Sequence, residues 1–428
     1  MRHDPTRLSR TSLAATLLLG ALTLPAAARV YDRVEVRGAE FVPQDDIRRA
    51  CGALDGIALE AADLAGVERC LMSTGVFERV SVSGQGDALV IDVTEVEQRP
   101  GRIEAAISWV NDRSLTGSLS YEQYNLLPDT FAAVHGDFSR DAKSFDISLY
   151  RADAFRPGLH FGIDILGQRS NFSDLAFSMR SHQAEFYLAA TPDEATRIEY
   201  GIGWRDHRLF GLDADASPLL QREQGQLDAP FLRLGFSHGD RAGGKTGGLF
   251  VQFEQLLWNL GTSSPISETR LELDARHVLA GGTVLMLGLD GGIVAGLSGN
   301  DTTALDRVFP GGDSFRGFAP RGIGPADGDD FLGGNRHLIL SAEVQRELGK
   351  VMGTALRGGI FADLGSVWGL DDTLGGRIDD KAHIRSSIGL SLTFDVASTP
   401  VSLYAAVPVR HQPQDERQVF GLSVNARF

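Results

Sequence analysis

Cysteine, basic charge and long apolar runs are all scarce in this 428-residue chain. Its two cysteines and ten scattered histidines form no metal-ligand pattern, so we expect no metal site. Lys and Arg number 41 against 56 Asp and Glu, a net charge of −15, which excludes the basic surface that nucleic-acid binding requires. A single apolar stretch, near the N-terminus, is the only candidate for a membrane helix, which excludes a protein with several helical spans.

Glycine, in contrast, is abundant. The chain has 50 glycines, about 12% of its residues against roughly 7% in average proteins, without any collagen-like period. Because glycine destabilises helices, a mainly helical fold is not expected. The hydrophobic share of 43% also excludes intrinsic disorder.

Residues 1–28 have the pattern of a secretory signal peptide. Three arginines lie among the first ten residues, an apolar stretch spans residues 12–25, and Ala26, Ala27 and Ala28 supply the small side chains of a cleavage site. The alternative is an uncleaved membrane anchor, although the apolar core is short for a span. We therefore predict an exported protein whose mature chain starts near Arg29.

Residues 29–98 change pattern several times and predict a small α/β domain. Period-two alternation predicts strands over residues 32–37, 77–83 and 88–94, and apolar residues at helical spacing predict helices over 44–51 and 59–73. Cys51 and Cys70 both fall in this region, so an exported protein would join them in a disulfide. Two buried free thiols are the alternative.

The order β-α-α-β-β, with the segment STGVFERVSV over residues 73–82 and VIDVTE over 90–95, resembles a POTRA domain. Such domains occur in outer-membrane transport and assembly proteins. A small open sheet of this kind offers an edge where another extended chain can add a strand. The alternative is a structural plug or spacer without client contact.

Residues 99–428 alternate between apolar and polar side chains in segments of roughly ten residues. Ile103, Ala105, Ile107 and Trp109, for example, share one face of their segment. A soluble β-sandwich would also alternate, but transmembrane barrels combine such segments with short turns on one side and longer loops on the other. We count sixteen strands, beginning near Arg102, Leu115, Thr130, Ser144, Gly158, Phe172, Thr196, Pro230, Gly247, Glu268, Thr283, Arg336, Gly353, His383, Pro400 and Gln418.

The predicted fold is therefore mainly β: a 16-stranded antiparallel transmembrane barrel preceded by one small α/β domain. With residues 29–98 in the periplasm, the longest connection, residues 297–335, lies outside the cell. The connections at 348–352 and 396–400 then face the periplasm, and both are short. The predicted topology is thus self-consistent.

Two motifs in the barrel resemble those of the BamA/TamA superfamily of outer-membrane assembly factors. The first, in the long outer loop, is similar to the VRGF motif and consists of Phe315, Arg316, Gly317 and Phe318, with Phe in place of Val. The second, similar to FxDxG, consists of Phe361, Asp363 and Gly365. The resemblance implies that the loop folds into the lumen, where Arg316 meets Asp363 and Glu343.

Alternation supports this placement independently, because Ser341, Glu343 and Gln345 share the polar face of their strand. A guanidinium in a partly dry lumen needs carboxylates, and its planar fork suits them. Arg316 as an ordinary exposed loop residue is one alternative. Another is a lumen contact that only holds the loop in place.

The last strand resembles the C-terminal signal of outer-membrane barrels, with Phe420 and Gly421 at its start and the terminal aromatic residue Phe428. Three other motifs are rejected. Residues 239–246 match the P-loop string, but a membrane-strand pattern follows where a helix is required. Residues 312–314 resemble an esterase GDS start without its partner blocks, and Asp206 and His207 are interpreted as a loop pair.

By resemblance, the chain assists insertion of outer-membrane proteins or translocates a polypeptide, without enzymatic activity or a cofactor. Its partners would be unfolded outer-membrane or secreted polypeptides, the lipid bilayer and periplasmic accessory proteins. A client strand would add to the POTRA edge and then enter the seam between the first and last strands. The single POTRA domain favours an accessory or specialised role. The alternative is a passive outer-membrane channel or receptor.

Overall fold

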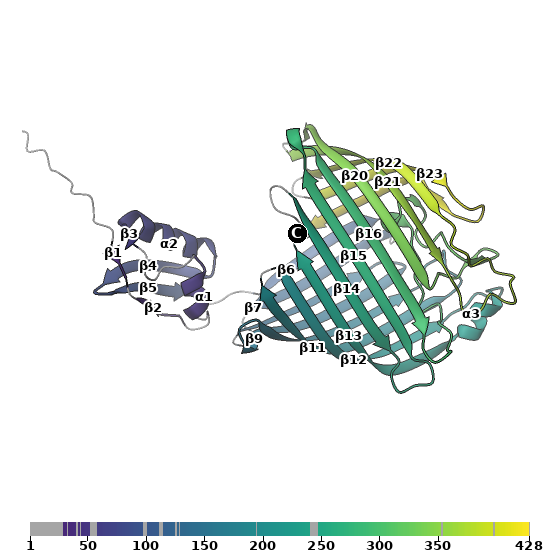
Figure 1. The fold of residues 1–428 in the computed structure, drawn as a ribbon, viewed down its shortest axis with the longest axis horizontal. Coiled ribbons are helices and arrows are strands. Elements are labelled where there is room, and N and C mark those ends of the chain that lie inside the picture. The colour runs from purple at the N-terminus through teal and green to yellow at the C-terminus, as the bar shows by residue number, and fades with distance from the viewer. Residues whose placement is uncertain are drawn as a thin grey trace, which may run out of the picture. The chain divides into compact units, whose positions relative to one another are not determined.

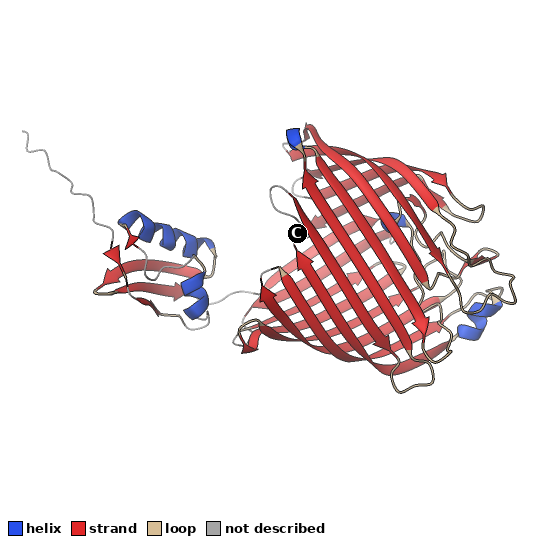
Figure 2. Ribbon diagram, in the orientation of Figure 1, coloured by secondary structure: helices blue, strands red, loops and turns tan. Residues whose placement is uncertain are grey.

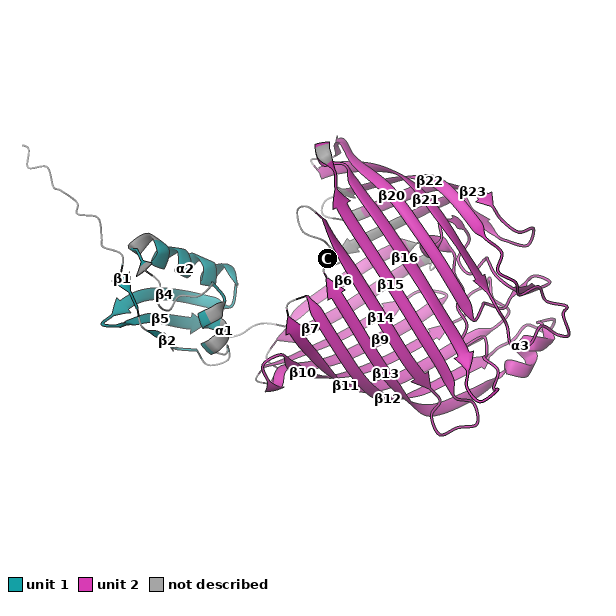
Figure 3. Ribbon diagram, viewed as in Figure 1, with its two compact units in different colours: residues 1–98 teal, residues 99–428 magenta. Residues whose placement is uncertain are grey.

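The computed structural model describes residues 29–31, 33–39, 42, 44–51, 58–96, 101–110, 114–124, 126–127, 129–193, 195–239, 247–351, 354–396 and 399–427. The chain divides into two compact units, residues 1–98 and 99–428 (Figure 3). The predicted signal peptide, most of the P-loop string and Phe428 lie outside the described residues. Within the described ranges, no helix is long and apolar enough to cross a membrane.

The N-terminal unit is a three-stranded sheet with two helices (Figure 2). In the sheet, β5 (Ala88–Glu95) lies between β2 (Arg33–Arg37) and β4 (Phe77–Gln85), parallel to β2 and antiparallel to β4. The central strand is apolar and fully buried from Ala88 to Ile91, and it packs with Ile47 and Leu71 from the helices. The elements are β1 (Arg29–Val30), β2 (Arg33–Arg37), α1 (Gln44–Arg49), β3 (Ala58–Leu59), α2 (Ala61–Ser73), β4 (Phe77–Gln85) and β5 (Ala88–Glu95).

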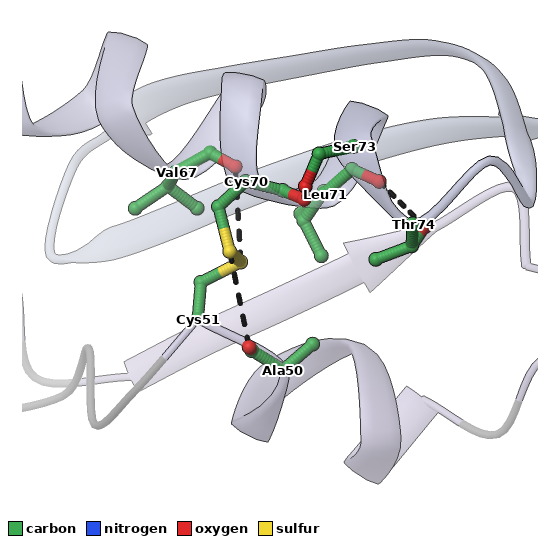
Figure 4. Close-up of a disulfide and its surroundings, with 7 residues drawn as sticks. All are labelled: Ala50, Cys51, Val67, Cys70, Leu71, Ser73 and Thr74. Carbon is green, nitrogen blue, oxygen red and sulfur yellow. Dashed lines mark hydrogen bonds between the residues drawn. A yellow bond between two sulfur atoms is a disulfide. The ribbon is translucent and has the colours of Figure 1, made fainter. Parts of the chain in front are cut away.

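Cys51 and Cys70 form a disulfide that joins the end of α1 to α2 (Figure 4). Their Cα atoms lie 6.1 Å apart, and the bond closes a segment of 19 residues. A crosslink over a segment of this length restricts the unfolded chain and contributes about 3 kcal/mol of stability.

The second unit is a closed antiparallel barrel whose last strand returns to pair with its first (Figure 1). Its sixteen strands are β6 (Arg102–Val110), β7 (Ser114–Tyr124), β8 (Thr130–Phe138), β9 (Ala142–Arg156), β10 (Leu159–Ser170), β11 (Ser178–Asp193), β12 (Thr196–Phe210), β13 (Gly225–Gly239), β14 (Gly247–Trp258), β15 (Ile266–Val278), β16 (Val284–Gly296), β20 (Arg336–Val351), β21 (Thr354–Trp368), β22 (Arg385–Val396), β23 (Thr399–Arg410) and β25 (Phe420–Arg427). The predicted fold class is confirmed.

Period-two alternation places apolar side chains on the outer face of the barrel wall. Ile103, Ile360 and Phe420 are each more than 65% exposed, whereas Glu343 and Asp363, on the opposite face of their strands, are at most 8% exposed. A large apolar residue so exposed would be unfavourable in water, and the pattern is that of a lipid-facing wall around a polar lumen.

Three sequence interpretations need correction. Strand β11 begins at Ser178 rather than near Phe172, because Phe172 packs into an apolar cluster between the outer loops. Strand β13 begins at Gly225 and runs through Pro230; its ladder to β14 starts only at Leu232, so no β14 partner requires the N–H that proline lacks. The pair at 206 and 207 lies within strand β12 rather than in a loop, on opposite faces.

Longer connections gather at one end of the barrel, together with α3 (Pro218–Glu223) (Figure 2). The connection over residues 297–335 carries the 3₁₀ turn η2 (Gly312–Ser314) and three two-residue strands, β17 (Gly317–Phe318), β18 (Ala326–Asp327) and β19 (Asp330–Phe331). Another 3₁₀ turn, η1 (Ala280–Gly282), joins β15 to β16, and β24 (Arg417–Gln418) precedes the last strand.

These outer connections are packed together. Leu219 and Leu220 of α3, Leu332 of the long loop and Ile378 of the β21–β22 connection belong to one buried apolar cluster. Thr302 donates hydrogen bonds to Asp371 from its backbone N–H and its hydroxyl, each 2.7 Å long. The long loop is therefore held by contacts from several sides, and these contacts fix the position of its tip.

Candidate functional site

The tip of the long outer loop is buried against the inner face of the barrel wall. Phe315 and Phe318 are fully buried, with ring centroids 4.9 Å apart in an edge-to-face arrangement. They pack with Ile339 of β20 and Val367 of β21, whose side chains point inward. This apolar contact places Arg316, between the two aromatic residues, inside the lumen.

Arg316 and Asp363 form a bidentate ion pair. The Nε and Nη2 atoms of Arg316 donate to the two carboxylate oxygens of Asp363 at 2.9 and 2.8 Å, and the backbone N–H of Arg316 donates to the same carboxylate at 3.2 Å. The Asp363 side chain is only 1% exposed. Two parallel hydrogen bonds to a dry carboxylate fix both the position and the orientation of the guanidinium.

Glu343 supplies a second carboxylate to the same guanidinium. Arg316 Nη1 donates to its Oε2 at 2.5 Å, while Ser391 Oγ and Gln345 Nε2 donate to Oε1 at 2.5 and 2.7 Å. These donors come from β20 and β22, on either side of the strand that carries Asp363. The arginine thus joins three neighbouring strands through side-chain contacts.

Phe361 forms the floor beneath the guanidinium. The Arg316 Cζ atom lies 3.5 Å from the ring centroid, a distance at which the face of the ring attracts a cation. The ring fits because Gly389 lies beside it on β22, where a Cβ would be 2.4 Å from the Phe361 Cζ atom. Phe361 also makes an edge-to-face contact with Tyr404 on β23, with centroids 6.2 Å apart.

Gly317 lies where the backbone requires glycine. Its φ of +96° is in the left-handed region, and a Cβ would lie 2.9 Å from the Cβ of Ser387. Ser387 in turn donates its hydroxyl to the Arg316 carbonyl at 2.5 Å. Gly365, the last residue of the second motif, also allows a close approach, since a Cβ there would lie 2.6 Å from the Leu338 carbonyl oxygen.

The loop tip is also bonded to the segment that leads into the last strand. Gly317 and Phe318 of β17 pair with Gln418 and Arg417 of β24. Backbone bonds of 2.9 Å from Ala319 to Glu416 and from Glu416 to Gly322 extend this contact. The inserted loop therefore contacts both the β20–β22 wall and the entry to β25.

The seam between β25 and β6 has a short described ladder. Ser423–Arg427 pairs with Ala106–Val110, whereas β6 pairs with β7 along its whole length, Arg102–Val110. Residues 102–105 lie opposite no described residue of β25. Phe420, at the start of the last strand, is 69% exposed on the outer face, and Gly421 lies beneath the Tyr404 ring.

The structure brings together Arg316, Asp363, Glu343 and Phe361, as the motifs implied. Sequence reasoning missed Ser387 and Ser391, although inward alternation from Arg385 along β22 could have identified them. It also missed the pair of Arg385 with Asp415, whose side chains are at most 1% exposed and joined by two bonds of 2.8 and 2.7 Å. That pair fixes the last outer connection to the wall.

The contacts at this site anchor the loop tip to the barrel wall. Its groups form ion pairs, a cation–π contact and strand pairing, and they join a loop, three wall strands and the segment before the seam. Across the described residues, His, Cys, Asp and Glu side chains form no group arranged to hold a metal ion.

The Omp85 superfamily domain matches residues 129–428 of the chain. Two outer membrane protein assembly factors named BamA are similar in sequence. The protein from Neorickettsia risticii (strain Illinois) is 21% identical over 85% of this chain and 50% of its own, and that from Neisseria meningitidis serogroup B (strain ATCC BAA-335 / MC58) is 22% identical over 95% and 58%. The chain thus spans between half and three-fifths of the length of these relatives.

Solved structures share the fold. The crystal structure of BamA from Haemophilus ducreyi lacking POTRA domains 1–3 superposes with a TM-score of 0.77 at 18% identity, covering 94% of this chain and 85% of that one. CdiB from Escherichia coli gives a TM-score of 0.56 at 13% identity, over 93% and 76%. The second similarity is weaker, and both are similarities of fold.

Proposed function

The chain belongs to the Omp85 superfamily, and on this premise we propose that it inserts or translocates polypeptides at the outer membrane through the seam between β25 and β6. The observation that carries the proposal is the position of the loop site. Arg316 fixes the loop tip to the wall, and the same tip pairs with Arg417 and Gln418 just before the seam strand. A site at this position can control how firmly the seam is closed.

The proposed mechanism follows from the free-energy cost of unpaired backbone groups in lipid. In lipid, each unpaired N–H or C=O costs several kcal/mol, so an entering client strand must be paired before it meets the membrane. The described ladder between β25 and β6 has fewer paired positions than the ladder between β6 and β7, so opening it breaks fewer backbone hydrogen bonds. A client strand pairing there would satisfy its backbone groups during insertion.

We propose that residues 29–98 form a POTRA domain that receives the client first. Its sheet has two outer strands, β2 and β4, whose free edges could accept an extended chain. The N–H of Val82 on β4 donates to Glu68 of α2 at 2.8 Å, which favours β2 as the receiving edge. The match to a BamA structure covers 94% of the chain, more than the barrel alone contributes, and supports this assignment.

A passive channel fits the structure less well. The outer connections are joined by buried contacts: Glu223 of α3 accepts from Ala304 of the long loop at 2.9 Å and pairs with the buried Arg307. Ser217 donates to Asp327 of the same loop at 2.7 Å. These contacts join α3 and the residue before it to the long loop, which favours packed outer connections over the open path that a channel requires.

Crosslinking the seam tests the proposal. Ser108 and Asn425 lie in register across it, so the S108C/N425C pair can be oxidised to lock β6 to β25. A matched control, S118C/D137C, locks β7 to β8, where Ser118 already donates to Asp137 at 2.6 Å. Both variants are reconstituted in liposomes, and folding of an added unfolded barrel client is followed by its protection from protease.

The proposal requires the seam lock to abolish client folding and the β7–β8 lock to leave it intact. Equal activity of both oxidised variants would exclude a lateral seam mechanism. A parallel variant lacking residues 29–98 tests the POTRA assignment, since it should retain a folded barrel but lose client capture.

A further inference from the structure

Four cationic side chains form a row across neighbouring strands near the outer end of the barrel. Lys143 of β9 lies opposite Arg169 of β10, Arg169 lies opposite Arg180 of β11, and Arg180 lies opposite Arg208 of β12. We refer to these four residues as the cationic row. Each strand thus contributes one cation at the same level of the wall.

The cationic row lies on the outer face of the barrel. Alternation puts Lys143 on the same face as Phe145, and Arg208 on the same face as Trp204, which are 42% and 52% exposed. Arg169 is likewise on the face of Ile165, 40% exposed. Lys143, Arg169 and Arg208 are themselves exposed. The row therefore borders the apolar belt on the side of the outer connections.

Such a row is unfavourable without an anion. Like charges directly opposite on neighbouring strands repel each other. Asp206 lies 3.6 Å from Arg180 and offsets one of the four charges. Within the described part of the chain, Lys143, Arg169 and Arg208 form no ion pair, so three cations have no carboxylate partner there.

A pocket of about 300 Å³ opens at the β9–β10 end of the row. It is lined by Arg140, Asp141, Ala142, Lys143, Arg169 and Asn171. At the other end, the Phe210 ring lies between two guanidiniums, with the Cζ atoms of Arg169 and Arg208 at 5.3 and 5.6 Å from its centroid. The surface therefore combines a pocket and an aromatic ring with its positive charge.

We propose that the cationic row and its pocket bind the phosphorylated headgroup of an outer-leaflet lipid. Guanidinium forks match phosphate oxygens, and the acyl chains of a bound lipid would lie along the apolar residues directly below the row. Continuity of the charged row with the apolar belt favours a lipid over a soluble anion, because only a lipid occupies both surfaces.

The row has defined limits, which provide a control. It is flanked by Phe138 of β8, opposite Lys143, and by Gln226 of β13, opposite Arg208. Arg336 of β20 also lies at the outer end of its strand but faces Ile293 and Trp368 on its neighbours. It is a single cation without a cationic neighbour in register, so its substitution controls for loss of one surface charge.

The experiment measures lipid binding by the detergent-solubilised full chain with native mass spectrometry. The probes are lipid A, which carries two phosphates, dephosphorylated lipid A and inorganic phosphate. The variants are the triple K143Q/R169Q/R208Q, the single R208Q and the control R336Q. Gel mobility shows whether each barrel resists denaturation in detergent, and therefore whether each variant folds. If the triple variant does not fold, the single variant R208Q is used to test the row.

We expect lipid A to bind the unmodified chain and R336Q equally, and the triple variant to bind roughly a hundredfold more weakly, with about a fivefold loss in R208Q. Dephosphorylated lipid A should bind no better than the triple variant binds lipid A. The proposal is overturned by unchanged binding to the row variants, by an equal loss in R336Q, or by inorganic phosphate binding as tightly as lipid A. That last outcome would define a small-anion site instead.

Discussion

Gly317 of the inserted loop pairs with Gln418, two residues before the last strand of the barrel. One residue earlier, Arg316 is held by Asp363 and Glu343 on the wall. The loop tip is thus bonded on one side to the wall strands β20 and β21, and on the other to the segment that leads into the seam strand β25. A change at the ion pair can therefore reach the seam through two consecutive residues.

Arg316→Ala should destabilise the barrel by about 3–5 kcal/mol, because it leaves two buried carboxylates without their cation. Asp363→Ala should cost a similar amount, and the double variant no more than either single one, since the two groups act together. Urea unfolding in detergent measures all three. Arg316→Lys keeps the charge but loses the fork, and should recover only part of the loss. Additive effects of the two alanine substitutions would show that they do not interact.

Gly317→Ala should displace the loop tip. The left-handed φ of +96° costs an L-residue about 1–2 kcal/mol, and the added Cβ would also press on Ser387. Gly299 in the same connection is the matched control, with a φ of +81° and open space around its Cβ. Gly299→Ala should therefore carry only the backbone cost. Protease sensitivity of the loop and urea unfolding compare the two, and equal behaviour would refute a packing role for Gly317.

The disulfide between Cys51 and Cys70 should stabilise only the N-terminal domain. Replacing both with serine removes a crosslink that stabilises the domain by about 3 kcal/mol, because the bond restricts the unfolded chain. Limited proteolysis should then cleave residues 29–98 faster while the barrel keeps its gel mobility. Thiol labelling of the denatured, unreduced wild-type chain should detect no free thiol. One or two labelled cysteines would contradict the bond.

Acid should loosen the outer loops through Asp371. Burial opposes its ionisation, but hydrogen bonds from Thr302 and Asn335 outweigh burial and hold the pKa of Asp371 below its usual value. A lowered folded pKa gives stability above the unfolded value of about 4, and that stability is lost as the pH falls through the folded pKa. Because the group is partly exposed, the effect should stay below about 1 kcal/mol.

Comparison of the wild-type chain with Asp371→Asn by thermal unfolding measures this effect. The two should differ at pH 7 and converge under acid. Asp301 is an exposed carboxylate beside Thr302, and Asp301→Asn should leave the unfolding temperature unchanged both at pH 7 and under acid. A difference between Asp371→Asn and the wild-type chain that persists at pH 2 would show that charge is not the cause.

The sequence could predict what depends on local periodicity. Alternation identified the strands and their inner and outer faces, and two motifs located Arg316 and Asp363. It could not predict where Phe172 lies, because an apolar residue before a strand serves equally well as its first residue or as part of a loop cluster. Arg385 and Asp415 are 30 residues apart, and only the closed barrel brings them together.

The last prediction concerns transmission from the ion pair to the seam. If Arg316 fixes β17 against β24, then Arg316→Ala should weaken that pairing and increase hydrogen exchange of the Phe420–Leu422 amides at the start of β25. Amides of the β14–β15 ladder, on another part of the wall, should exchange as before. Arg233→Ala is the matched control, because Arg233 is also an inward arginine: it pairs with Glu185 and Glu199 at 2.7 and 2.6 Å, and Glu254 lies 3.8 Å away.

General destabilisation would increase exchange at β25 in both variants, whereas a specific connection through the loop would do so only in Arg316→Ala. The distinction is sharp because both substitutions remove one lumen guanidinium that is held by carboxylates, and only Arg316 is adjacent in sequence to a residue paired with β24. An arginine with carboxylate partners elsewhere on the wall lacks that adjacency. Faster exchange at β25 in Arg233→Ala as well would mean that the barrel responds as one unit, and the loop would then have no separate control over the seam.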